Sequence, residues 1–146
     1  VYKRQALYKA FEAAGMHLPQ FGRALITVKD ADKAEATALA KRFREVGYQL
    51  VATSGTAKAF EKAGITVSTI EKLDSGQETI LEDIANRKIQ LVINTMSADK
   101  KVSSDGFRIR EAAIEHGVPL MTSLDTAGAI LKVLELQAFS ISPIKS

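Results

Sequence analysis

Leu91-Val92-Ile93-Asn94-Thr95 is the most apolar of the strands that the sequence predicts. A strand in which Val, Ile and Leu follow one another almost without interruption is buried on both of its faces. Such burial is typical of a parallel sheet that carries helices on both sides. This short run therefore predicts an α/β fold.

Outward from this run, four more short apolar segments alternate with amphipathic segments. The predicted strands cover residues 24–28, 49–53, 65–70, 91–95 and 119–121. The predicted helices cover residues 34–46, 56–62, 80–86, 105–116 and 125–136, with one more helix at 6–14. Short connections and right-handed crossovers make this a single-domain, open, mainly parallel five-stranded sheet with helices on both faces. We place the domain at residues 23–146 and treat residues 1–22 as a helix and connector from an upstream region.

Composition narrows the class of protein. The chain has 146 residues, of which 46% are hydrophobic and 25% charged, so one domain of this size needs neither a metal nor a disulfide to fold. It contains no cysteine, which excludes thiolate metal sites and fits a cytoplasmic protein. No apolar run reaches the roughly 20 residues of a membrane span. The net charge of +3, with 6% aromatic residues, does not indicate a nucleic-acid surface.

Polar residues follow the predicted strands at their carboxyl ends, where open α/β sheets bind their ligands. The second strand runs into Thr53-Ser54-Gly55-Thr56, where hydroxyls, a glycine and a helix start together favour an anion such as a phosphate. The other residues that we expect at this edge are Thr27, Lys33, Lys72, Asn94 and Thr95. Each also has an ordinary explanation, since Ser and Thr often serve as turn or N-cap residues and lysines are usually solvated.

Other candidates for chemistry are weaker. His17 and His116 have no metal-ligand spacing, so no metal site is expected. Asp74 follows the third strand, but Asp-Ser-Gly is also a common turn. Asp125 is a candidate N-cap of the last helix. The sequence has no Ser/His/Asp arrangement, no phosphate-binding Walker loop and no dinucleotide-binding glycine motif.

Six segments in order resemble the C-terminal regulatory domain of the carbamoyl-phosphate synthase large subunit, which has the methylglyoxal-synthase-like fold. They are Phe21-Gly22-Arg23-Ala24-Leu25-Ile26-Thr27-Val28, Asp32-Lys33, Ala52-Thr53-Ser54-Gly55-Thr56-Ala57, Glu71-Lys72, Ile93-Asn94-Thr95 and Asp105-Gly106-Phe107-Arg108-Ile109-Arg110. The resemblance extends from about residue 6 to residue 136, and within it Ala6-Leu7-Tyr8-Lys9-Ala10-Phe11 and His17-Leu18-Pro19 resemble the junction with the synthetase body.

This resemblance implies an effector site with no catalytic residue, which binds a nucleoside monophosphate such as UMP or IMP. Thr53, Ser54, Gly55 and Thr56 would hold the phosphate with Lys33 and Thr27. Phosphate or ribose would contact Lys72, Asn94 and Thr95, and the base would contact Asp105 and Ile109. Thr122 matches a position that contacts ornithine in some members, at the boundary with the synthetase body.

The same resemblance implies the partners of the domain. They are the rest of the synthetase large subunit and its glutaminase small subunit, with a homo-oligomer as a further possibility. The parent enzyme makes carbamoyl phosphate for pyrimidine and arginine biosynthesis, and it uses ATP and a divalent metal outside this domain. No cofactor is expected within the domain itself.

Three alternatives remain open. Methylglyoxal synthase uses this fold to abstract a proton from dihydroxyacetone phosphate, which requires a carboxylate base. Its Gly-Gly-Asp pattern is matched only by Asp74-Ser75-Gly76, with the aspartate displaced, and Thr95-Met96 stands where its second aspartate is expected. The inosinate cyclohydrolase domain shares the first half, but its Lys-Thr-Leu-His-Pro-Lys segment is absent after Lys72. The domain could also serve mainly as an oligomer contact.

Overall fold

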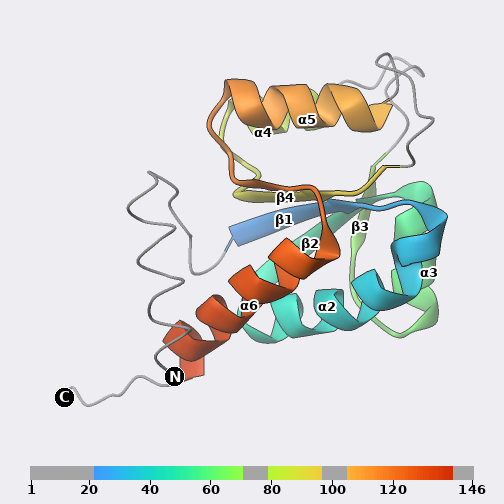
Figure 1. The fold of residues 1–146 in the computed structure, drawn as a ribbon. Coiled ribbons are helices and arrows are strands. Elements are labelled where there is room, and N and C mark those ends of the chain that lie inside the picture. Colours follow the sequence, from blue (N-terminus) through green and yellow to red (C-terminus); the bar gives the residue numbers. More distant parts are fainter. Residues whose placement is uncertain (1–21, 71–78, 97–104, 140–146) are drawn as a thin grey trace.

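The computed structural model describes residues 22–70, 79–96 and 105–139, and within them five strands alternate with helices (Figure 1). The predicted helix at 6–14 and the residues around Lys72 and Asp74 lie outside the described residues. In chain order the elements are β1 (Gly22–Thr27), the 3-10 turn η1 (Asp30–Asp32), α2 (Lys33–Glu45), β2 (Tyr48–Thr53), α3 (Ser54–Lys62), β3 (Ser68–Ile70), α4 (Thr79–Ala85), β4 (Leu91–Asn94), α5 (Asp105–Glu115), β5 (Leu120–Met121) and α6 (Leu124–Phe139).

The five strands form one sheet in the order β3-β2-β1-β4-β5, and all four neighbouring pairs are parallel. From β1 the chain moves outward through β2 to β3, then crosses back to β4 on the other side of β1. The strand order therefore reverses between β1 and β4, where Thr27 and Asn94 are register partners. Open sheets bind ligands at such a reversal, outside the carboxyl ends of the strands.

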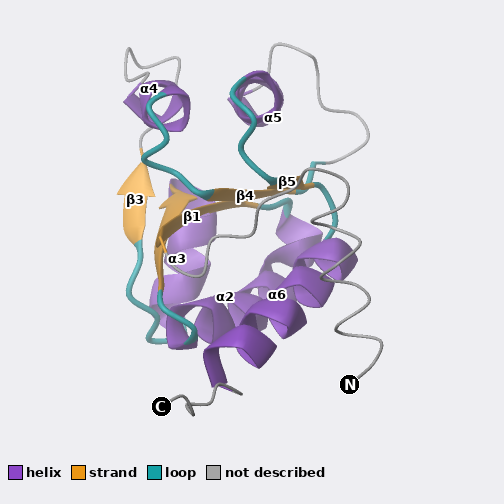
Figure 2. Ribbon diagram, turned by 90° about the vertical axis from the view of Figure 1, so that its left-hand side faces the viewer, coloured by secondary structure: helices purple, strands orange, loops and turns teal. Residues whose placement is uncertain are grey.

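Helices cover both faces of the sheet (Figure 2), with α2, α3 and α6 on one side and α4 and α5 on the other. Successive residues of β1 pack alternately into the cores on the two sides of the sheet. Ile26 belongs to the core with Phe43 and Phe60, whereas Leu25 belongs to the core with Ile109. All four residues of β4 are buried, as the apolar run at 91–95 predicts. The expected α/β architecture is confirmed.

Element boundaries differ from the predicted ones at two informative places. Helix α3 begins at Ser54 rather than at Thr56, so the polar motif after β2 forms the first turn of the helix. Asp125 is not the N-cap of α6, because Ser123 precedes the helix and its Oγ accepts a hydrogen bond from the Thr126 N–H at 3.2 Å. Asp125 instead lies in the first turn of α6, where the positive end of the helix dipole favours an acidic residue.

None of the helices in the described part of the chain combines the length and the apolar character needed to cross a bilayer.

Candidate functional site

Three threonine hydroxyls meet at the carboxyl ends of β1 and β2. Thr27 ends β1 and Thr53 ends β2, and their Oγ1 atoms lie 3.3 Å apart. The Oγ1 of Thr56, from the first turn of α3, lies 3.5 Å from that of Thr53. We call Thr27, Thr53 and Thr56 the threonine cluster. The sequence predicts this meeting, because the carboxyl ends of parallel neighbours share one edge of the sheet.

Within the threonine cluster, Thr56 also has a structural role. Its side chain is buried, and its Oγ1 accepts a hydrogen bond from the Val28 N–H at 3.4 Å. This bond joins the loop after β1 to the first turn of α3. The exposed residues of the motif are Ser54 and Gly55, so a ligand would approach α3 at these two positions.

The start of α3 has the features of an anion site. Thr53 occupies the N-cap position in an extended conformation, and its side chain makes no capping hydrogen bond to the helix. The first N–H groups of a helix have no partner within the helix, and they lie at the positive end of its dipole. Gly55 in this turn has no side chain to keep an anion away from the backbone.

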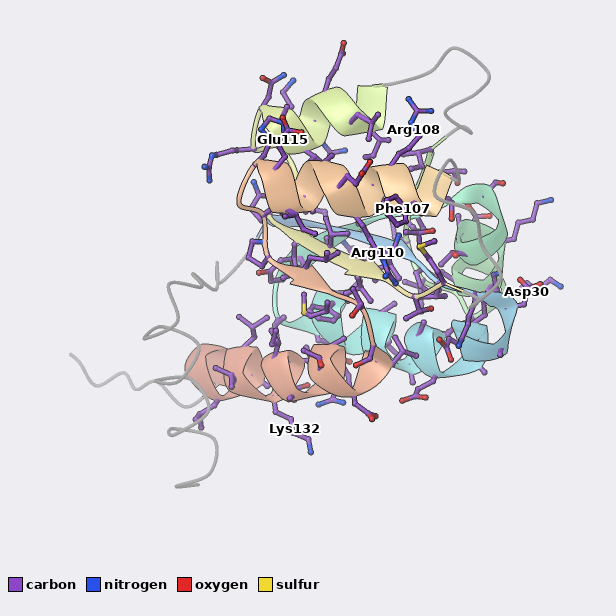
Figure 3. The ribbon with its side chains drawn as sticks, turned by 45° about the horizontal axis from the view of Figure 1, so that its top comes forward. Asp30, Phe107, Arg108, Arg110, Glu115 and Lys132 are labelled. Atoms are coloured by element: carbon purple, nitrogen blue, oxygen red, sulfur yellow. The ribbon has the colours of Figure 1, made fainter. Side chains whose placement is uncertain are left out.

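Lys33 adds a positive charge to this turn. It is the first residue of α2, and its Nζ lies 3.6 Å from the position that a β-carbon on Gly55 would occupy. The ammonium therefore lies directly over the start of α3, as predicted from the sequence. It also forms an ion pair with Asp30, whose side chain is 98% exposed. Figure 3 shows Asp30 at the outer edge of the molecule.

At the end of β4 the predicted polar residues are engaged in internal hydrogen bonds. Asn94 is fully buried, and its Nδ2 donates to the carbonyl oxygen of Gly106 at 3.0 Å. The Thr95 Oγ1 accepts from the Lys29 N–H at 3.0 Å, and the Thr95 N–H donates to the Thr27 carbonyl oxygen at 3.1 Å. Thr95 thus ties the end of β4 to the loop after β1, and Asn94 ties it to the start of α5.

The remaining predicted residues are spread more widely. Ile109 is buried in the core beneath α5 with 1% of its side chain exposed, and Thr122 is exposed beyond β5. Asp105 begins α5, but its side chain is outside the described residues, and Lys72 is outside them altogether. Described residues contain no group of acidic or histidine side chains suited to a metal.

A family model for the MGS-like domain matches residues 35–122, which is more than half of the chain. The chain belongs to the MGS-like domain family. The matched region includes the start of α3 and the end of β4, while Thr27 and Lys33 lie just before it.

A solved structure supports the same fold for this MGS-like domain. Methylglyoxal synthase from Elizabethkingia anophelis NUHP1 superposes with a TM-score of 0.64 over 78% of this chain and 79% of that chain. The two sequences are 21% identical, so the likeness is one of fold.

Arg110 of the MGS-like domain stands in the segment at 105–110 that carries the resemblance, but it is not among the predicted site residues. Its Nε donates to Asn94 Oδ1 at 2.7 Å, and its Nη2 donates to the Asn94 carbonyl oxygen at 3.0 Å. A signal for it exists in the sequence, because an asparagine that ends a fully apolar strand must find hydrogen-bond partners when it is buried. Gly106 and Arg110 are four residues apart in α5, so they lie on one face of that helix.

Proposed function

We propose that this MGS-like domain is the effector-binding domain of a carbamoyl-phosphate synthase large subunit, and that it binds a nucleoside monophosphate, UMP or IMP. The observation that carries the proposal is the position of the Lys33 ammonium over Gly55, beside the threonine cluster. The ordered resemblance to that regulatory domain supports the choice of ligand and parent enzyme.

A monophosphate fits the chemistry of this turn. Its oxygens are acceptors for the free N–H groups at the start of α3, for the hydroxyl of Ser54 and for the Lys33 ammonium. Hydrogen bonds of this charge-assisted kind are shorter and stronger than neutral ones. Binding would exchange the Asp30 carboxylate on Lys33 for a phosphate oxygen, so the lysine keeps an anionic partner throughout.

Regulation would follow from a coupling free energy of about 1 to 3 kcal/mol between this site and the remote synthetase sites. The synthetase sites would use ATP and a divalent metal, and the glutaminase subunit would supply ammonia. The assembly would be cytoplasmic. UMP would act as the inhibitor that reports on pyrimidine supply. The domain taken alone would bind the nucleotide without showing the regulation.

A second candidate is methylglyoxal synthase activity, because the similar solved structure carries that name. The start of α3 could hold the phosphate of dihydroxyacetone phosphate equally well. Catalysis would further require a carboxylate base placed at the substrate carbon. Asp30 is a poor candidate, because its side chain is almost fully exposed and its carboxylate pairs with the Lys33 ammonium, the group that would hold the substrate phosphate. Asp74 lies outside the described residues.

Calorimetric titration of the chain with UMP and IMP, next to a turnover assay with dihydroxyacetone phosphate, separates the candidates. We expect saturable nucleotide binding and no methylglyoxal. Lys33→Gln should weaken UMP binding about ten-fold or more, because a hydrogen bond to a charged group is lost. Lys41→Gln, an exposed lysine later in α2, is the matched control. Binding that is insensitive to Lys33→Gln, or the absence of binding, would refute the proposal. Formation of methylglyoxal would then favour the second candidate, and its absence would leave a role in assembly.

A further inference from the structure

The end of β4 is tied to the first turns of α5 by one small set of hydrogen bonds. Asn94 donates from Nδ2 to the Gly106 carbonyl oxygen, and Arg110 donates to both the side-chain oxygen and the backbone carbonyl of Asn94. We call Asn94, Gly106 and Arg110 the Asn94–Arg110 clamp. Figure 3 shows Arg110 reaching from α5 toward the sheet, whereas Arg108 on the same helix points away from it.

The Asn94–Arg110 clamp depends on the residue types that form it. A guanidinium can donate two hydrogen bonds in a fixed planar arrangement, whereas a lysine ammonium has no such fork. Here both bonds go to one residue, so Arg110 fixes the orientation of the Asn94 amide and of its backbone together. Gly106 allows the close approach, because a β-carbon there would lie 3.4 Å from Asn94 Nδ2 and from Met96 Sδ.

The position of the clamp links it to ligand binding. Asn94 is the register partner of Thr27, so the clamp lies next to the threonine cluster at the reversal of the strand order. The first turn of α3, which would hold the phosphate, lies on one side of the sheet, and α5 lies on the other side (Figure 2). A ligand whose phosphate occupies the start of α3 and that extends along this edge of the sheet toward β4 would therefore meet the first turns of α5.

We propose that Arg110 is a positioning residue, which places the start of α5 against the part of the ligand beyond the phosphate. This inference rests on the proposed function, because it requires a ligand larger than a phosphate. The binding site then has two halves, and a substitution in one half should weaken the contacts of that half alone. The phosphate half consists of Lys33 and the start of α3, and the other half is held in place by the Asn94–Arg110 clamp.

The test compares wild type, Arg110→Gln and Arg110→Lys for binding of UMP and of inorganic phosphate. Arg110→Gln should weaken UMP binding about ten-fold, with phosphate affinity changed less than about two-fold. Arg110→Lys should fall between wild type and Arg110→Gln, since it retains a charge and one donor group. Arg44→Gln, an exposed arginine of α2, should leave both affinities unchanged.

Amide hydrogen exchange gives a readout that does not depend on the ligand. Arg110→Gln should increase exchange within residues 106–110 and leave α3 unchanged. Equal losses of UMP and phosphate affinity, or unchanged exchange in α5, would overturn the positioning role. If the wild-type chain binds no UMP at all, the proposed function fails, which is a different result from UMP binding that ignores Arg110.

Discussion

Gly55→Ala should separate binding from stability more cleanly than any other single change. Gly55 lies in the first turn of α3, where its missing side chain leaves room between the helix backbone and Lys33. A β-carbon at this position would lie 3.6 Å from the Lys33 Nζ and 3.7 Å from its Cε, which is ordinary van der Waals contact. The substitution therefore fits the folded chain without a clash.

The two expected effects have opposite signs. Alanine is favoured over glycine in a helix by up to about 1 kcal/mol, which for a domain of this size corresponds to a rise in melting temperature of about 3 °C. The added methyl group fills the space that an anion between the helix backbone and Lys33 would need. Losing one charge-assisted hydrogen bond costs about 1.5 to 3 kcal/mol, so UMP affinity should fall by about ten-fold or more.

Calorimetric titration and thermal unfolding of the same preparation measure both effects. Gly128→Ala is the matched control, because Gly128 also lies within a helix and its added β-carbon would meet only Leu39 Cδ2 among the described atoms within 4 Å, at 3.9 Å. It should raise the melting temperature similarly and leave UMP affinity unchanged. If Gly55→Ala binds UMP as tightly as wild type, the anion does not lie over the start of α3 and the reasoning is wrong.

Three further predictions concern the surroundings of this turn and the core. Asp30→Asn should raise phosphate affinity by up to about five-fold at low salt, because it removes the competing anion from Lys33. Glu115→Gln, an equal change of charge at the far end of α5, should leave phosphate affinity unchanged. A loss of phosphate affinity in Asp30→Asn would show that Asp30 assists binding. Thr56→Val removes the acceptor of the buried Val28 N–H and should lower the free energy of unfolding by about 1 to 3 kcal/mol in urea; an unchanged unfolding midpoint would mean that this bond contributes nothing. Burial raises the pKa of the Tyr48 phenol to about 12, whereas an unfolded chain releases this proton near pH 10. The folded state therefore binds the proton more tightly, so stability should be unaffected below about pH 10 and should fall between pH 10 and 12; a Tyr48→Phe variant that declines identically would contradict this.

The sheet was predictable from the sequence because burial on two faces leaves a simple pattern. The run at 91–95 is apolar throughout, and the structure buries every residue of β4. The gathering of Thr27, Lys33 and the turn after β2 also followed from the sequence, since parallel strands bring their carboxyl ends to one edge.

Contacts across the fold could not be predicted in this way. The buried end of β4 indicates that Asn94 needs a partner, but no local pattern identifies Arg110 as that partner, because it is 16 residues away and on a different element. The helix starts were also misplaced for a local reason. Asp, Ser and Thr all serve as N-caps, so the sequence alone does not choose between Ser123 and Asp125, and the choice is made by how β5 leads into α6.

The most direct test of the account is a nuclear magnetic resonance titration of the isotope-labelled chain with UMP. The N–H groups of Gly55 and Thr56 should shift and saturate together, because the phosphate is held by the start of α3. Inorganic phosphate should shift the same two signals, whereas residues of α5 should respond to UMP alone. Shifts confined to other parts of the sheet, or signals of Gly55 and Thr56 that do not move while UMP binds, would contradict the account.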